Sequence, residues 1–221
     1  MASMYSVDAG CVDISYLVLG MIDNNVYVIS DGKATVVVDP SCHHKDIIAA
    51  LGDRTVDAII LTHHHYDHTG AACALREATG ATVIASAADA PYIEDDSLTK
   101  RDPRKSKACP VDRKVADGDR VEIGGMAWEV IATPGHTPGS LCFFLAPEFG
   151  PYPDRAGVLI AGDTLFYDSI GRTDFEGGSM TDMRASLKKL ATLPDNTIVL
   201  PGHSLLTTIA AERPRVFARY A

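Results

Sequence analysis

The segment "LTHHHYDHTG", Leu61–Gly70, holds four of the eight histidines of this 221-residue chain and one aspartate within six consecutive residues. It follows an apolar run, "DAII", that is typical of a buried strand. His63 and His65 are two residues apart, so on an extended segment both side chains can point the same way. Asp67 and His68 stand at the start of the helical pattern that follows and can face a second point. The spacing therefore indicates a site that binds cations.

Short apolar runs rich in β-branched residues recur between turn signals and predict strands. They cover residues 13–19, 25–30, 34–39, 57–62, 81–86, 120–123, 127–133, 140–146, 157–163 and 197–202. Helical patterns lie between them, over 67–79 and 179–193, and Ser179 and Asp182 have the spacing of a capping box. Strands interleaved with helices predict an α/β protein with helices outside a sheet core. Because no linker or low-complexity segment interrupts the pattern, we expect a single domain over residues 1–221.

Five of the predicted strands deliver a histidine or an aspartate to the loop just past their C-terminal end. These residues are Asp39 in "VVVDP", His63 to His68, His136 in "TPGH", Asp163 in "AGD" and His203 in "LPGH". In open α/β sheets this edge is where active sites form. Imidazole and carboxylate suit zinc, iron or manganese, and no cysteine occupies any of these positions.

Seven of these residues are candidate metal ligands, too many for one tetrahedral ion. They are His63, His65, Asp67, His68, His136, Asp163 and His203. The number suits two ions that share a carboxylate, since paired hydrolytic metals lie roughly 3.5–4 Å apart. His64 points away from its neighbours on an extended segment, so we expect it to support the site or lie at the surface. His43 and His44 are expected to be surface residues.

"HHHYDH" resembles the His-x-His-x-Asp-His signature of the metallo-β-lactamase superfamily, and the later ligands follow in that family's order. The resemblance covers nearly the whole chain and implies a four-layer αβ/βα sandwich with the metal site at the strand-end edge. It also implies two divalent metal ions, with zinc as the first expectation and iron or manganese as alternatives. By this resemblance His63, His65 and His136 hold the first metal. Asp67, His68 and His203 hold the second, Asp163 bridges the two, and Asp39 helps to hold the histidine loop.

The finer resemblance is to glyoxalase II, the hydroxyacylglutathione hydrolases, and is carried by "THHHYDHTG", "TPGHTPGSLCF", "GDTLFYDSIGRTDFEGG" and "LPGH". Larger members have a C-terminal helical domain and a Gly-Lys-Phe-Tyr type segment that grips glutathione, whereas this chain has "GRTDF", 171–175. Arg172 can replace the lysine charge, but Phe175 has no hydroxyl. Arg172, Phe175 and Tyr66 are the candidate substrate contacts, although Tyr66 can equally pack, and Asp174 can instead clamp Arg172.

The expected function is hydrolysis of a small thioester such as S-acylglutathione by a metal-bridging hydroxide, with Asp67 orienting the hydroxide or managing its proton. "GRTDF" also occurs in persulfide dioxygenases, which use one iron, so an enzyme of that kind is the alternative. A third interpretation is a metal-binding module without catalytic activity. The complete ligand set argues against this third interpretation.

The composition limits the partners of the protein. The net charge is −9, with 29 acidic and 20 basic residues, which argues against nucleic-acid binding. No apolar run approaches the roughly 20 residues that span a bilayer. The N-terminus resembles no secretory signal, and the five scattered cysteines are typical of reduced thiols, so a cytoplasmic location is expected. The basic segment "KRDPRKSK", Lys100–Lys107, is expected to be a solvated loop or to attract an anionic substrate.

Overall fold

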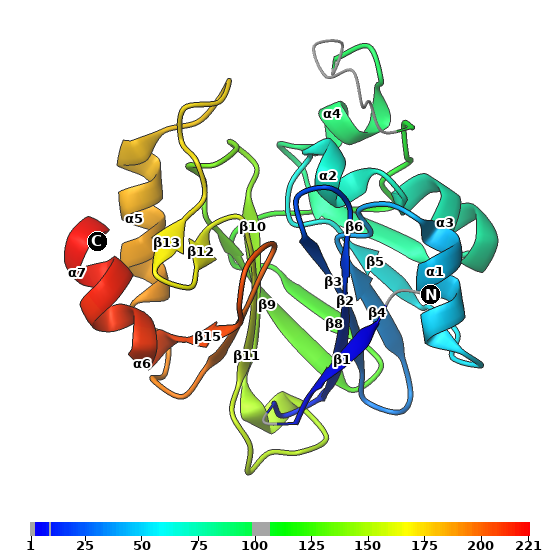
Figure 1. The fold of residues 1–221 in the computed structure, drawn as a ribbon, viewed down its shortest axis with the longest axis horizontal. Coiled ribbons are helices and arrows are strands. Elements are labelled where there is room, and N and C mark those ends of the chain that lie inside the picture. Colours follow the sequence, from blue (N-terminus) through cyan, green and yellow to red (C-terminus); the bar gives the residue numbers. More distant parts are fainter. Residues whose placement is uncertain (1–2, 9, 99–106) are drawn as a thin grey trace.

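Two β-sheets lie face to face at the centre of the computed structural model, with helices on both outer sides (Figure 1). The structure describes residues 3–8, 10–98 and 107–221. The first sheet has seven strands in chain order: β1 (Met4–Val7), β2 (Asp13–Leu19), β3 (Asn24–Ser30), β4 (Thr35–Val38), β5 (Ala58–Ile60), β6 (Thr82–Ser86) and β7 (Arg113–Val115). Strands β4 to β7 are parallel, and the first four are joined as antiparallel neighbours.

The second sheet has six strands and a different order. From edge to edge they are β15 (Thr207–Thr208), β14 (Ile198–Pro201), β11 (Val158–Gly162), β10 (Leu141–Leu145), β9 (Met126–Ala132) and β8 (Arg120–Ile123). Only β11 and β14 pair in parallel in this sheet. A small separate hairpin follows β11 and consists of β12 (Leu165–Phe166) and β13 (Ser169–Ile170).

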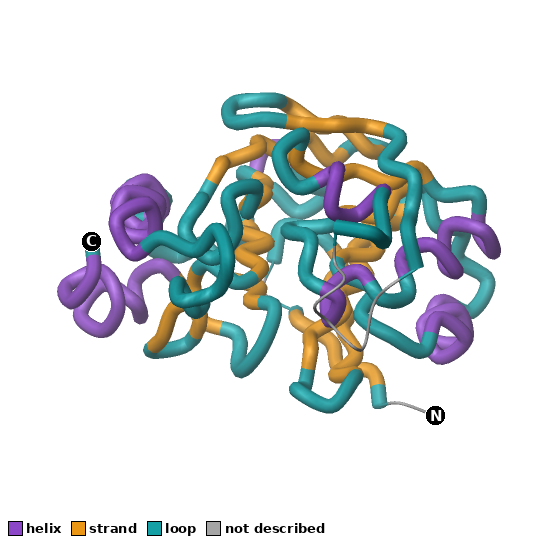
Figure 2. The backbone as a smooth tube through the Cα atoms, turned by 90° about the horizontal axis from the view of Figure 1, so that it is seen from above, coloured by secondary structure: helices purple, strands orange, loops and turns teal. Residues whose placement is uncertain are grey.

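The larger groups of helices lie on two opposite flanks, and strands, loops and short helical segments lie between them when the molecule is seen from above (Figure 2). Those that follow strands of the first sheet are α1 (His44–Leu51), α2 (Tyr66–Thr69), α3 (Ala72–Thr79) and α4 (Ala90–Glu94). Those beside the second sheet are α5 (Met180–Leu190), α6 (Ile209–Glu212), the π-helical turn Arg213–Phe217 and α7 (Ala218–Tyr220). A 3-10 turn, Pro147–Phe149, follows β10.

Three apolar layers hold these elements together. Trp128 and Phe143 are fully buried in the layer between the two sheets. A second layer joins the first sheet to the helices on its outer side, where Leu75 of α3 is buried. The third joins the second sheet to α5, whose buried residues include Met183 and Leu187. Helix, sheet, sheet and helix are therefore stacked in four layers, and the predicted αβ/βα sandwich is confirmed.

All ten predicted strands are present, with ends that differ by at most two residues. The strands β1, β7, β12, β13 and β15 were not predicted, because each has only two to four residues. The helix predicted over 67–79 was wrong in one respect, since the structure has two helices, α2 and α3. The chain approaches the Ser41 carbonyl so closely at Gly70 that a Cβ there would lie 2.3 Å from the oxygen.

The N-terminus of α5 confirms the predicted cap, because the Ser179 side chain accepts a hydrogen bond from the Asp182 backbone. The basic segment predicted at Lys100–Lys107 lies outside the described residues except for Lys107, which forms an ion pair with Glu77. Within the ranges that the structure describes, none of the helices has the length and apolar character needed to cross a membrane.

Candidate metal centre

The loop that follows β5 and the helix α2 together carry four histidines, and a buried carboxylate holds Thr62 of this loop in place. Asp39, just past β4, accepts hydrogen bonds from the backbone N–H of Thr62 at 2.8 Å and from its hydroxyl at 2.7 Å. Asp39 has the left-handed conformation, with φ of 47°. The strand β5 therefore delivers the histidine loop in a fixed direction, at the edge of the sheet where α2 lies (Figure 1).

The first cluster consists of His63, His65 and His136, each of which offers a ring nitrogen within 4.8 Å of the other two. Nδ1 of His65 lies 2.8 Å from Nε2 of His136. The Nδ1 of His136 faces outward and donates to the Arg172 carbonyl at 2.7 Å, which leaves the Nε2 lone pair directed into the cluster. Nε2 of His63 is buried and has no hydrogen-bond partner among the described residues.

The second cluster consists of Asp67, His68 and His203, with the same mutual spacing. Oδ2 of Asp67 lies 3.3 Å from Nε2 of both histidines. The outward nitrogens are again engaged: Nδ1 of His68 donates to Asp39 at 2.9 Å, and Nδ1 of His203 donates to the Ile22 carbonyl at 3.0 Å. Both rings therefore turn Nε2 toward Asp67.

Asp163, which follows β11, lies between the two clusters. Its Oδ2 is 3.4 Å from Nε2 of His136 and 3.7 Å from Nε2 of His203, and its Oδ1 is 3.3 Å from Nε2 of His68. The structure thus brings together all seven residues singled out in the sequence, and it puts Asp163 in contact with both groups. Asp39 also has ligand spacing to His63 and His68. Its carboxylate already accepts three hydrogen bonds, however, so it supports the loop.

The pKa values of the histidines differ in direction between the two clusters. Burial, followed by the neighbouring imidazoles, lowers the pKa of His63 well below its ordinary value. The same causes lower the pKa of His65 to about 3. The pKa of His136 is also lowered, because burial has a larger effect than the Asp163 carboxylate, which would raise it. The first cluster therefore presents three neutral histidines, the form that binds a metal ion.

The second cluster is charged. Burial would raise the pKa of Asp67 and Asp163, but the histidines around them lower both values. Burial would lower the pKa of His68, yet the carboxylates of Asp163 and Asp39 raise it well above its ordinary value. The pKa of His203 is raised as well, since the hydrogen bond to Asp67 outweighs burial. A cation that binds beside Asp67 and Asp163 therefore competes with protons for the ring nitrogens of His68 and His203.

The residues fit a pair of divalent cations. Buried polar atoms are nearly always hydrogen-bonded, so each exception requires an explanation. Nε2 of His63 and Oδ1 of Asp163 are buried without a hydrogen-bond partner among the described residues. Each belongs to the ligand set, and imidazole and carboxylate donors suit zinc, iron and manganese equally.

One residue inside the site was missed by the sequence analysis. Asn24, at the start of β3, is 2% exposed, and its amide nitrogen donates to Oδ2 of Asp67 at 3.1 Å. The same nitrogen lies 3.5 Å from Nε2 of His68 and 3.4 Å from Nε2 of His203. Asparagine at the start of a strand is common, so its type and position carried no signal of this role.

The candidate substrate contacts lie beside the first cluster. The Phe175 ring is 5.6 Å from the His65 ring and 5.9 Å from the His136 ring, and it is 41% exposed. The Arg172 guanidinium lies 4.2 Å from the centre of the Phe175 ring and forms a two-pronged ion pair with Asp174. Tyr66 is half-buried at the first position of α2.

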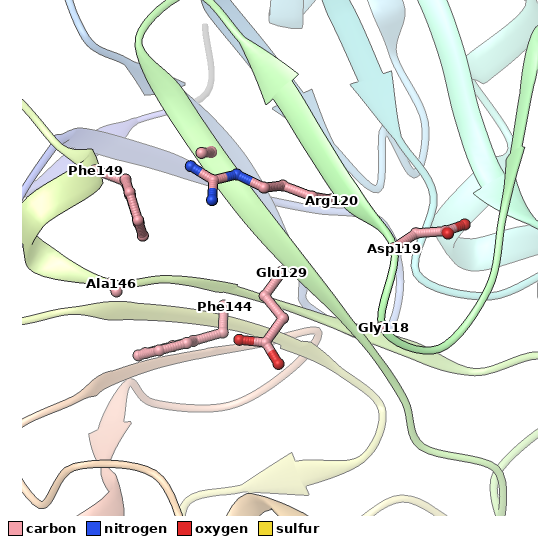
Figure 3. A pocket seen from close by; sticks show the side chains of 8 residues that line it. Gly118, Asp119, Arg120, Glu129, Phe144, Ala146 and Phe149 are labelled. Atoms are coloured by element: carbon pink, nitrogen blue, oxygen red, sulfur yellow. The ribbon is translucent and has the colours of Figure 1, made fainter.

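A pocket of about 240 Å³ lies elsewhere on the molecule (Figure 3). Residues of segments 118–129 and 144–149 line it, including Arg120, whose guanidinium lies 4.3 Å from the centre of the Phe149 ring. None of its lining residues belongs to the cluster of histidines and aspartates, so this pocket plays no part in the candidate metal centre.

The chain matches the family described as "Metallo-beta-lactamase superfamily" over residues 19–203. A hydroxyacylglutathione hydrolase of Rhodospirillum rubrum is 39% identical over 185 residues, which cover 82% of this chain and 62% of that protein. The chain therefore spans less than two thirds of this relative.

Three solved structures are also similar. The BLEG-1 B3 metallo-beta-lactamase has a TM-score of 0.83 at 36% identity, covering 92% of this chain and 98% of that chain. TTHA1623 in a di-iron-bound form has a TM-score of 0.78 at 32% identity, covering 90% of this chain and 97% of that chain. ETHE1 from Myxococcus xanthus has a TM-score of 0.74 at 31% identity, covering 94% of this chain and 84% of that chain.

Proposed function

Because the chain belongs to the metallo-beta-lactamase superfamily, we propose that it is a dinuclear metal-dependent hydrolase that cleaves a small thioester such as S-acylglutathione. The observation that carries the proposal is the pair of complete ligand groups in contact with one shared carboxylate, Asp163. One ion alone would use only one of these groups. The fit of the second group supports two ions, and hydrolysis is the usual chemistry of such pairs.

The proposed ligands belong to the two groups of side chains described above. His63, His65 and His136 hold the first ion. Asp67, His68 and His203 hold the second, and Asp163 reaches both. Zinc is the first expectation, and the same donors accept iron or manganese.

Two divalent cations held by these residues would lower the pKa of bound water and polarise the carbonyl of a substrate. Asp67 would orient such a water and manage its proton, because its pKa is lowered by the neighbouring histidines and its carboxylate accepts a hydrogen bond from the Asn24 amide. A thiolate is a good leaving group, so the thioester reaction requires no strong general acid. No serine or cysteine nucleophile is needed.

The thioester class is supported by the motif resemblance to glyoxalase II and by the identity to the Rhodospirillum rubrum hydrolase. An exposed basic and aromatic pair, Arg172 and Phe175, beside the first cluster suits the anionic carrier end of such a substrate. Since Asp174 already pairs with Arg172, the substrate carboxylate has to compete with it.

Replacing Arg172 by glutamine is expected to raise KM for S-D-lactoylglutathione roughly fivefold and to change kcat little, because an exposed charge contributes modestly to binding. The rise should shrink at high salt, since exposed charges are screened. Asp174→Asn is the matched control: it frees Arg172 and should leave KM unchanged or lower it. An unchanged KM in Arg172→Gln at low salt would show that Arg172 does not contribute to substrate binding.

The proposed activity is tested by loading metal-analysed protein with zinc, iron or manganese in turn and following thiol release from S-D-lactoylglutathione. We expect rapid release with about two metals per chain. A cephalosporin is measured in parallel, because the BLEG-1 structure is that of a B3 metallo-beta-lactamase. Hydrolysis of the β-lactam alone would reassign the substrate, and no hydrolysis of either would reject the thioesterase.

The alternative is a persulfide dioxygenase, and the observation that favours it is the segment "GRTDF", 171–175. An enzyme of this kind would bind one iron and consume oxygen with a glutathione persulfide. Oxygen uptake together with about one iron per chain would therefore replace the hydrolase proposal.

A further inference from the structure

One buried carboxylate near the metal centre has no role in the proposed reaction. Asp89 is 1% exposed and lies between β6 and α4, far in the chain from every proposed ligand. Its backbone N–H donates to the Ser86 hydroxyl at 2.9 Å, which fixes its own position. Burying an ionised carboxylate is costly unless hydrogen bonds compensate it, so its partners indicate what it does.

The partners of Asp89 come from two different loops. Its Oδ2 accepts a hydrogen bond from the backbone N–H of His64 at 2.9 Å and another from the Thr137 hydroxyl at 2.8 Å. The His64 ring also lies against it, with Nδ1 2.9 Å from Oδ2. His64 stands between the proposed ligands His63 and His65.

Thr137 directly follows the third proposed ligand of the first cluster, His136. A single carboxylate oxygen thus connects the backbone of the histidine loop to the loop that carries His136. Space at this contact is tight: a Cβ at Gly139 would lie 2.2 Å from Oδ1 of Asp89. The loop is therefore packed directly on the carboxylate, and Gly139 is the residue type that permits it.

Asp39 shows the same arrangement on the side of the second cluster. It joins the backbone at Thr62 to the ring of His68. The two carboxylates come from the strands on either side of β5, since Asp39 follows β4 and Asp89 follows β6, with the histidine loop of β5 between them. Each one fixes a different side of that loop.

We propose that Asp89 is a positioning residue for the first metal, which sets the distance between His65 and His136 by tying their two loops together. The inference rests on the metal centre of the proposed function and is independent of the substrate. Residues that hold metal ligands in place typically contribute 10–100-fold to metal affinity. Asp89 should therefore affect the first ion and leave the second unchanged.

The test uses two backgrounds, each of which retains one metal position. In His203→Gln only the first position is intact, and in His136→Gln only the second is. Zinc affinity is measured for each, with and without Asp89→Asn, by competition with a chromophoric chelator. We expect Asp89→Asn to weaken zinc binding about 10–100-fold in the His203→Gln background and less than about twofold in the His136→Gln background.

Two further variants keep the test independent of folding. Thr137→Val retains the shape of the side chain and removes one hydrogen bond to Asp89, so it should weaken the first position alone, by a smaller factor. Asp57→Asn is the matched control, because Asp57 also accepts a backbone N–H, that of Thr35 at 2.8 Å, at the other end of the sheet. It should change neither affinity.

The inference is overturned if Asp89→Asn weakens both positions equally or neither, as a purely structural role would lower thermal stability without selecting one ion. If the wild-type protein binds no metal, both this inference and the proposed function fail. If it binds two and hydrolyses no thioester, only the substrate is wrong, and the affinity comparison still decides the role of Asp89.

Discussion

Replacing Asp67 by alanine is expected to lower kcat for thioester hydrolysis by about 10²–10⁴-fold while the chain remains folded. The carboxylate lies 3.3 Å from Nε2 of both His68 and His203, and Asn24 donates to it. Its removal takes away one ligand of the second ion and the group that orients the attacking water. The effect should fall on kcat and kcat/KM together, because the lost interaction is made in the transition state.

The chain should stay folded because Asp67 belongs to none of the three apolar layers. It lies in the four-residue helix α2, and its 12% exposed side chain contacts only polar groups among the interactions described for it. Asp46→Ala in α1 is the matched control, since Asp46 is a helical carboxylate that is 43% exposed and belongs to neither ligand group. It should retain full activity.

Steady-state kinetics, far-ultraviolet circular dichroism and metal analysis of the two variants make the comparison. A folded Asp67→Ala protein with two metals and near-wild-type kcat would reject the proposed role of this carboxylate. Loss of one metal with loss of turnover would support ligation as its main contribution.

The sequence predicted that the seven candidate ligands would lie close together, because most of them follow strand ends. Alternation and β-branched runs indicated where β5, β9 and β11 end, and His63, His136 and Asp163, which meet, lie within four residues of those ends. The spacing of His63 and His65 also predicted correctly that the two rings share one cluster. The local sequence pattern can therefore predict which side chains meet when their positions depend on where a strand ends.

The residues that were missed act through contacts across the fold. Asn24 meets Asp67 from 43 positions away, and Asp89 meets Thr137 from 48 positions away. Neither residue lies in a pattern of its own that distinguishes it from an ordinary turn or strand end. The break between α2 and α3 was also missed, since it involves a contact from another segment, where the Ala71 backbone N–H donates to the Pro40 carbonyl at 2.9 Å.

Removing the metals with a chelator is expected to abolish hydrolysis and to lower the melting temperature, and reloading should restore both. A ligand present at a hundredfold excess over Kd stabilises the folded state by about 2.7 kcal/mol, which is roughly 5–11 °C for a domain of this length. The metal-free chain should still fold, because Trp128, Phe143 and the rest of the central layer lie apart from the ligands.

A histidine outside the cluster, His43, can be compared with one inside it, His136. His43 is exposed and lies outside the cluster, with φ of 53°, a conformation that asparagine tolerates. His43→Asn should therefore bind two metals and respond to the chelator as the wild type does. His136→Gln should retain about one metal per chain and lose turnover, since the first position depends on three histidines.

Metal analysis, thermal unfolding and thiol release on the same samples decide the outcome. Full activity in protein with less than about a tenth of a metal per chain would refute metal-dependent hydrolysis. The buried Nε2 of His63 makes that result unexpected: without a cation it has no partner among the described residues, and an unsatisfied buried polar atom costs about 1–3 kcal/mol. Cations bound at the two clusters would satisfy this atom and the Oδ1 of Asp163, so metal loss should be measurable in stability even before activity is assayed.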